Sequence, residues 1–112
     1  MVDKLTFEFA ILIIKSTELL FHQKHLVIAG QLLKSGTSIG ANVREAKQAE
    51  SRADFIHKLK IASKEASETE YWLLICKEMN YFDTTICLQN LLVIQKILSS
   101  SISTAKQNQK SQ

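Results

Sequence analysis

Two pairs of polar side chains are the best candidates for chemistry, because each pair is spaced three residues apart within an apolar helical pattern. Asn42 and Glu45 form the first pair, and Glu65 and Glu68 form the second. If the two segments are antiparallel neighbours, the four side chains converge, and buried carboxylates need hydrogen-bond partners or protons. The amide of Asn42 can both donate and accept. We therefore predict a buried or half-buried polar network that is structural rather than catalytic.

A carboxylate metal site, as in di-iron bundles, is the alternative interpretation of the same four residues. Those sites use Glu-x-x-His pairs on two helices, but no histidine follows any of these glutamates by three positions. The histidines, at positions 22, 25 and 57, do not form a zinc signature with the two cysteines. No metal or other cofactor is expected. No glycine-rich nucleophile elbow is present, so an enzyme has little support.

Six basic residues surround the predicted connection near position 50 and form the candidate nucleic-acid surface. They are Arg44, Lys47, Arg52, Lys58, Lys60 and Lys64. Such a cluster can contact phosphates, whereas solvated lysines on exposed helix faces are the ordinary alternative. Lys60 and Lys64 share a face with His57, and no aromatic residue interleaves with them to stack bases. Any nucleic-acid binding is therefore expected to be weak and independent of base sequence.

Gly36 and Gly40 lie four residues apart in a run of small residues where a helical pattern would normally be apolar. Each glycine inside a helix costs roughly 0.5–1 kcal/mol relative to alanine. A phosphate-binding loop does not fit, because no strand precedes the run and no Gly-Lys-Ser/Thr follows it. The spacing predicts a flat surface for close helix packing.

Four long helices must position these residues. The chain has no proline and only three glycines. Asp3, Ser51 and Asp83 are the expected N-terminal caps, and Asn80 is the expected C-terminal stop of the third helix. Short connections between long helices favour antiparallel neighbours, so we predict an all-α, antiparallel up-down-up-down four-helix bundle. It forms a single domain over residues 1–112, with a polar tail over about 106–112. The predicted helices cover about 3–21, 25–49, 51–79 and 83–105.

Apolar residues on the third predicted helix form two adjacent seams. The first seam is Phe55, Leu59, Ala62, Ala66, Thr69, Leu73 and Cys76, and the second is Ile61, Glu65, Glu68, Trp72, Ile75 and Met79. The first predicted helix is apolar around most of its circumference, which indicates that it is covered on more than one side. We therefore expect a homo-oligomer, and a thickly packed monomeric core is the alternative.

Composition limits the class of protein. The chain has 112 residues and a formal net charge of +3, which permits an anionic partner without requiring one. Cys76 and Cys87 lie within apolar helical patterns, so two buried free thiols in a reducing cytosol are expected. A disulfide across the turn between the third and fourth helices is the alternative. No signal peptide or membrane span is evident, so a cytoplasmic protein is expected.

The small-residue run and the acidic-aromatic run together resemble the small bacterial four-helix bundle proteins called the S23 or 23S rRNA intervening-sequence protein family. The matching residues are Ser38-Ile39, Asn42 and Glu45, then Asp54-Phe55, Ile61-Ala62, Lys64-Glu65-Ala66, Glu68-Thr69 and Tyr71-Trp72-Leu73. The resemblance implies antiparallel bundles that assemble into homopentamers. A related branch, the accessory variability proteins of diversity-generating retroelements, is a basic pentamer associated with nucleic acid. By this resemblance we expect a non-catalytic oligomer that binds RNA or a nucleoprotein, with a purely protein-binding scaffold as the alternative.

Overall fold

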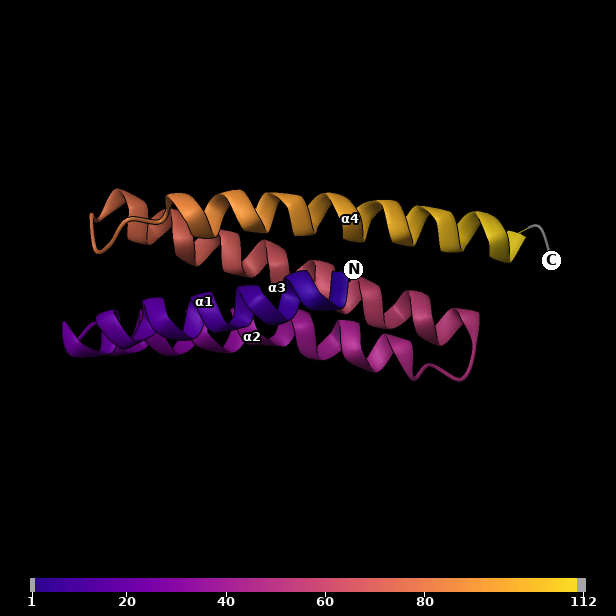
Figure 1. Cartoon of the computed structure of the whole chain (residues 1–112), viewed down its shortest axis with the longest axis horizontal. Helices are drawn as coiled ribbons and strands as arrows, with labels where there is room; N and C mark the ends of the chain where they lie inside the picture. The colour runs from indigo at the N-terminus through magenta and orange to yellow at the C-terminus, as the bar shows by residue number, and fades with distance from the viewer. Residues whose placement is uncertain (1, 111–112) are drawn as a thin grey trace.

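Four helices run along the described part of the molecule, which measures 52 × 20 × 20 Å. The structure is a computed structural model that describes residues 2–110. Helices that follow one another in the chain contact each other, and the first also contacts the fourth. The diagonal pairs make no close contact within the described residues. The fold is the predicted antiparallel four-helix bundle (Figure 1). Its helices are α1 (Val2–His22), α2 (Leu26–Lys47), α3 (Arg52–Glu78) and α4 (Thr85–Lys110).

Local capping signals place several of the helix ends where the sequence predicts them. The Ser51 hydroxyl accepts a hydrogen bond from the Asp54 amide at 3.0 Å, which satisfies one of the free N–H groups of α3. Asn80 follows the end of α3 with a φ of 55°, the left-handed conformation that ends many helices. The Asp83 carboxylate accepts a hydrogen bond from the Thr85 amide at 3.1 Å. These predictions are confirmed.

Two helix ends differ from the prediction. Asp3 does not precede the first helix, because α1 begins at Val2. The fourth helix does not end near Ala105 but continues through Lys110, while residues 111 and 112 lie outside the described part. Ala105 is buried and Ile102 packs against the core. These contacts, with no glycine or proline nearby, let the helix continue into its polar segment.

The core contains the first of the two predicted seams of α3. Leu59, Ala62, Ala66, Thr69, Leu73 and Cys76 are buried, and Ile56 joins them while Phe55 is half-buried. The second seam lies at the edge of the core, because its residues are half-buried or exposed, although Trp72 packs against the core. A helix in a four-helix bundle packs on two neighbours, so only about half of its circumference is covered.

The helices do not all begin and end at the same position along the long axis of the bundle. α1 begins part-way along the bundle, so the α2–α3 turn and the last turns of α4 project beyond its first residues (Figure 1). We call this the open end of the bundle; it holds the start of α1, the end of α2, the start of α3 and the end of α4. Within the described residues, the segment Thr85–Gln109 is long and apolar enough to cross a membrane by length and composition alone. Core helices of bundles pass the same test, so this is weak evidence for a membrane span.

Candidate functional site

The four residues predicted to form a polar network are not hydrogen-bonded to one another within the described residues. Asn42 and Glu65 are half-buried, whereas Glu45 and Glu68 are exposed. Among residues 2–110, no hydrogen bond or ion pair joins any two of them. The Asn42 amide instead donates to the Ser38 carbonyl oxygen of its own helix at 2.9 Å. The prediction of a network among these residues is therefore wrong for the single chain. The four positions lie on the outer side of α2 and α3, where no third helix covers them.

Glu65 and Glu68 lie beside two aromatic rings on α3. The Trp72 indole nitrogen donates to Glu68 Oε1 at 3.3 Å, and the Tyr71 ring meets the Trp72 ring edge-on at 5.0 Å. Burial raises the pKa of Glu65, and the charge of Glu68 raises it further, while Lys34 of α2 lowers it. These residues form an acidic and aromatic patch on α3, in which Glu65 and Trp72 are half-buried and Glu68 and Tyr71 are exposed.

The buried polar link between α2 and α3 is made by hydroxyl groups that the sequence analysis did not single out as partners. Thr69 Oγ1 donates to Ser35 Oγ at 3.0 Å, and both side chains are buried. The Thr69 hydroxyl also lies 2.7 Å from the Glu65 carbonyl oxygen. The sequence could have indicated this link, because Thr69 carries a hydroxyl group within an apolar seam, and buried hydroxyl groups need hydrogen-bond partners.

The acidic surface and the hydroxyl link allow a paired prediction. Glu68→Ala should change the free energy of unfolding by less than about 0.5 kcal/mol, since Glu68 is exposed. Thr69→Val should lower it by about 1–2 kcal/mol, because it leaves the buried Ser35 hydroxyl without its donor. Urea titrations of dilute protein, followed by circular dichroism, would measure both values. A larger loss for Glu68→Ala than for Thr69→Val would contradict this placement.

Gly36 and Gly40 lie where α1 crosses α2. A Cβ atom on Gly36 would come within 2.8 Å of Ile13 Cγ2, and one on Gly40 would come within 3.3 Å of the Thr6 carbonyl oxygen. Both positions need a small residue because the helices approach closely here. The flat surface predicted from the sequence is thus part of the α1–α2 contact.

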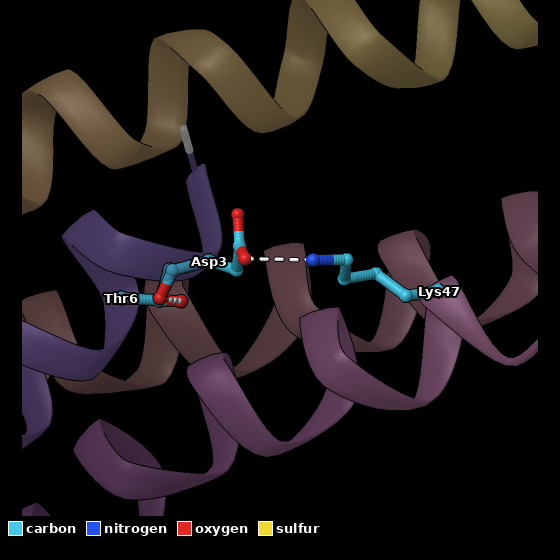
Figure 2. A network of polar contacts seen from close by, with 3 residues as sticks. All are labelled: Asp3, Thr6 and Lys47. Carbon is cyan, nitrogen blue, oxygen red and sulfur yellow. Dashed lines mark hydrogen bonds and ion pairs between the residues drawn. The ribbon is translucent and has the colours of Figure 1, made fainter.

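The six basic residues do not act as one cluster. Lys47 lies 2.8 Å from Asp3 Oδ2, and Thr6 Oγ1 donates to the Asp3 carbonyl oxygen (Figure 2). The hydrogen bond from Lys47 holds the pKa of Asp3 well below its usual range. Lys58 lies 3.7 Å from Glu45. The remaining four are exposed and make no ion pair in the part of the chain that the structure describes: Arg44, Arg52, Lys60 and Lys64.

Two neighbouring grooves with basic walls lie at the open end. The first, with a volume of about 510 Å³, lies between the start of α1 and the end of α2. The second, of about 340 Å³, lies at the α2–α3 turn and shares Lys47 with the first. The first groove is lined by Asp3, Lys4, Thr6, Phe7, Ala10, Thr37, Gly40, Ala41, Arg44, Lys47 and Gln48. The second is lined by Ala46, Lys47, Ala49, Ser51, Arg52 and Phe55.

Large apolar side chains are exposed along α1 and at the start of α2. Phe7, Ile11, Ile14 and Phe21 recur at spacings of four, three and seven residues, which places them on one face of α1. Leu26 at the start of α2 is 59% exposed. Single exposed apolar residues are ordinary, whereas these four share one face of α1.

The cysteines are free and buried, as predicted. Burial, and to a lesser extent the nearby Cys87, raise the pKa of Cys76 to about 11, so the thiol stays protonated at neutral pH. Cys87 Sγ lies 3.6 Å from Ser16 Oγ. Across residues 2–110, no group of three or more His, Cys, Asp or Glu side chains is placed to hold a metal ion.

These features define an all-helical, four-helix bundle protein whose distinctive surfaces are basic grooves and an apolar stripe. A model of the family described as 23S rRNA-intervening sequence protein matches residues 1–103, and the chain belongs to this family. It is similar to a crystal structure of a protein with unknown function from the S23 ribosomal protein family of Bacteroides thetaiotaomicron VPI-5482. The identity is 46% and the TM-score 0.89, over 91% of this chain and 98% of the other. No curated protein matches the chain.

Proposed function

We propose that this protein is a non-catalytic, cytoplasmic homo-oligomer, with a pentamer as the first choice by family resemblance. The observation that carries the proposal is the exposed apolar stripe on α1. Ile11, Ile14 and Phe21 are each at least 38% exposed, so a single chain leaves this face in water.

The total surface of the chain supports assembly. The chain exposes 7052 Å². A compact monomer of 12.7 kDa would expose roughly 6,200 Å². Part of the excess comes from the elongated shape. Its size, roughly 800 Å², is also what one partner buries in a standard protein interface.

The distribution of reactive groups supports a non-catalytic role. The two thiols are buried and protonated, and the half-buried Glu65 has neither a histidine nor a hydroxyl hydrogen-bonded to its carboxylate among the described residues. An activated nucleophile requires a base within hydrogen-bond distance. A structural or binding role fits these residues better than a chemical step.

Light scattering on a sizing column would test the assembly. The wild-type chain should elute with a mass several times that of one chain at micromolar concentration. The double substitution Ile11→Glu and Ile14→Glu should reduce the measured mass to that of one chain, because it would place two charges in the interface that the stripe forms on assembly. The matched control is Val93→Glu on the outer side of α4, where Val93 is 48% exposed. A monomeric wild-type protein would refute the proposal.

Weak RNA binding is the second candidate function, and the exposed basic residues favour it. Arg44 lies in the last turn of α2, and Arg52 and Lys60 lie in the first third of α3. In a cyclic assembly of parallel copies these charges would gather on one rim, so that several weak contacts act together. A protein-binding scaffold with no nucleic-acid role is the alternative.

A titration with labelled RNA at two salt concentrations would test this second function. Affinity should fall steeply with salt, by the release of counterions from the phosphates. Arg52→Glu with Lys60→Glu should weaken binding to every sequence alike, whereas Lys96→Glu on α4 should have a smaller effect. Absence of binding at low salt would leave the scaffold as the function.

A further inference from the structure

The tertiary structure brings aromatic rings next to the basic residues at the open end, where the sequence keeps most of them apart. Phe7 of α1 is 62% exposed and lines the same groove as Arg44 and Lys47 of α2. Phe55, which is half-buried, lines the second groove with Lys47 and Arg52. The first groove therefore combines one phenyl ring with three cations, and the second combines one ring with two.

We propose that these two adjoining grooves bind consecutive nucleotides of single-stranded RNA, with bases against Phe7 and Phe55 and phosphates against Arg44 and Arg52. This inference rests on the second function proposed above and names the form of RNA and its site. Proteins that bind single strands combine a positively charged groove with aromatic side chains on which bases stack.

The charges of the first groove suit an anionic strand. Its lining contains three basic side chains and one acid, and that acid, Asp3, is held by Lys47 at 2.8 Å (Figure 2). Arg44 makes no ion pair within residues 2–110, so its guanidinium is available for a phosphate. The second groove has Lys47 and Arg52 and no acidic lining residue.

The shape of the first groove suits a base. Its floor is made of small side chains, Ala10, Gly40 and Ala41, so a flat ring can approach the helix backbones beside Phe7. Thr37 and Gln48 add polar atoms on the α2 side. A third groove shares Ala41, Arg44 and Gln48 with the first and is also lined by Glu45, Glu50, Asp54 and Lys58. Those acids repel phosphates and direct the strand along the side that holds Lys47.

Duplex RNA fits this arrangement poorly. Bases in a duplex are stacked on one another and cannot reach a phenyl ring at the floor of a groove. The proposal therefore predicts a preference for single strands that the basic charges alone would not produce, since a duplex carries the denser phosphate charge.

Fluorescence anisotropy at low salt, with a labelled oligouridylate and a duplex RNA of equal length, would test the site. Phe7→Leu, which keeps an apolar side chain but removes the ring, should raise the Kd for the single strand at least about fivefold. The same substitution should leave the Kd for the duplex unchanged. The matched control is Tyr71→Leu, which removes a ring that is 59% exposed on α3 and lines neither groove. Arg44→Gln should weaken single-strand binding more than Lys60→Gln does.

A second readout detects stacking directly. The emission of 2-aminopurine placed in the strand should be quenched by the wild-type protein and less quenched by Phe7→Leu. Circular dichroism would establish that each variant folds.

The outcomes separate the two proposals. No binding of either RNA by the wild-type protein would overturn both the RNA function and this site. Binding that Phe7→Leu and Tyr71→Leu leave equally strong, or that favours the duplex, would overturn the site alone. A change in oligomer mass with Phe7→Leu and no change in Kd would also overturn it, and would identify a second copy of the chain as the occupant of the groove.

Discussion

Replacing Phe9 by alanine is expected to lower the free energy of unfolding by about 3–5 kcal/mol, the range for a buried aromatic side chain that is truncated. Phe9 is 1% exposed and belongs to the main apolar core. It is one of three large apolar side chains that α1 buries completely, with Ile13 and Leu20. Urea denaturation followed by circular dichroism would measure the loss.

The control for this prediction lies two residues away. Phe7→Ala removes the same atoms from a side chain that is 62% exposed, so it should change the free energy of unfolding by less than about 0.5 kcal/mol. Equal losses at both positions would mean that α1 is rotated about its axis relative to the structure described above. Phe7 then could not line the groove at the open end.

Gly36→Val is expected to lower the free energy of unfolding by about 3 kcal/mol, at the upper end of the usual cost of overpacking. A Cβ atom at this position would lie 2.8 Å from Ile13 Cγ2 and 2.9 Å from Ile13 Cγ1. These atoms are close to the α1 backbone, and a β-branched side chain in a helix has one strongly preferred rotamer. Ile13 cannot turn away, so the two helices must separate.

The other glycines of α2 supply controls for Gly36. Nothing among the described residues lies within 4 Å of a Cβ atom on Gly30, so Gly30→Ala should stabilise the protein by about 0.5–1 kcal/mol through helix propensity alone. Gly40→Ala should change the free energy of unfolding by an amount between those of Gly30→Ala and Gly36→Val, because a Cβ atom there would lie 3.3 Å from the Thr6 backbone. Thermal unfolding curves would rank the three variants. A stabilising Gly36→Val would refute the close α1–α2 contact.

Features set by short-range interactions could be predicted from the sequence. The cap at Ser51, the stop at Asn80 and the first seam of α3 depend on residues within a few positions of one another. The close packing at Gly36 and Gly40 was also predictable, because glycines inside a helix are costly without a close neighbour. The fold class followed from these signals and from the short connections.

The position of the second seam shows where such reasoning fails. Helical periodicity places Glu65, Glu68 and Trp72 on one face of α3, but it does not say whether another helix covers that face. The structure leaves the face largely open, so the expected network with Asn42 and Glu45 does not form within the chain. Burial of a polar group depends on a neighbour's position, which the residues themselves do not encode.

The sequence by itself determined the four helices, their antiparallel order and the core position of the first seam of α3, because each follows from local periodicity and short connections. The tertiary structure alone decided which charges are paired and which rings lie beside them. Asp3 and Lys47 are 44 positions apart, yet they form the shortest ion pair described. Phe7 reaches the basic groove only because α1 begins beside the end of α2. Contacts between distant segments arise from helix packing, so they cannot be inferred from spacing along the chain.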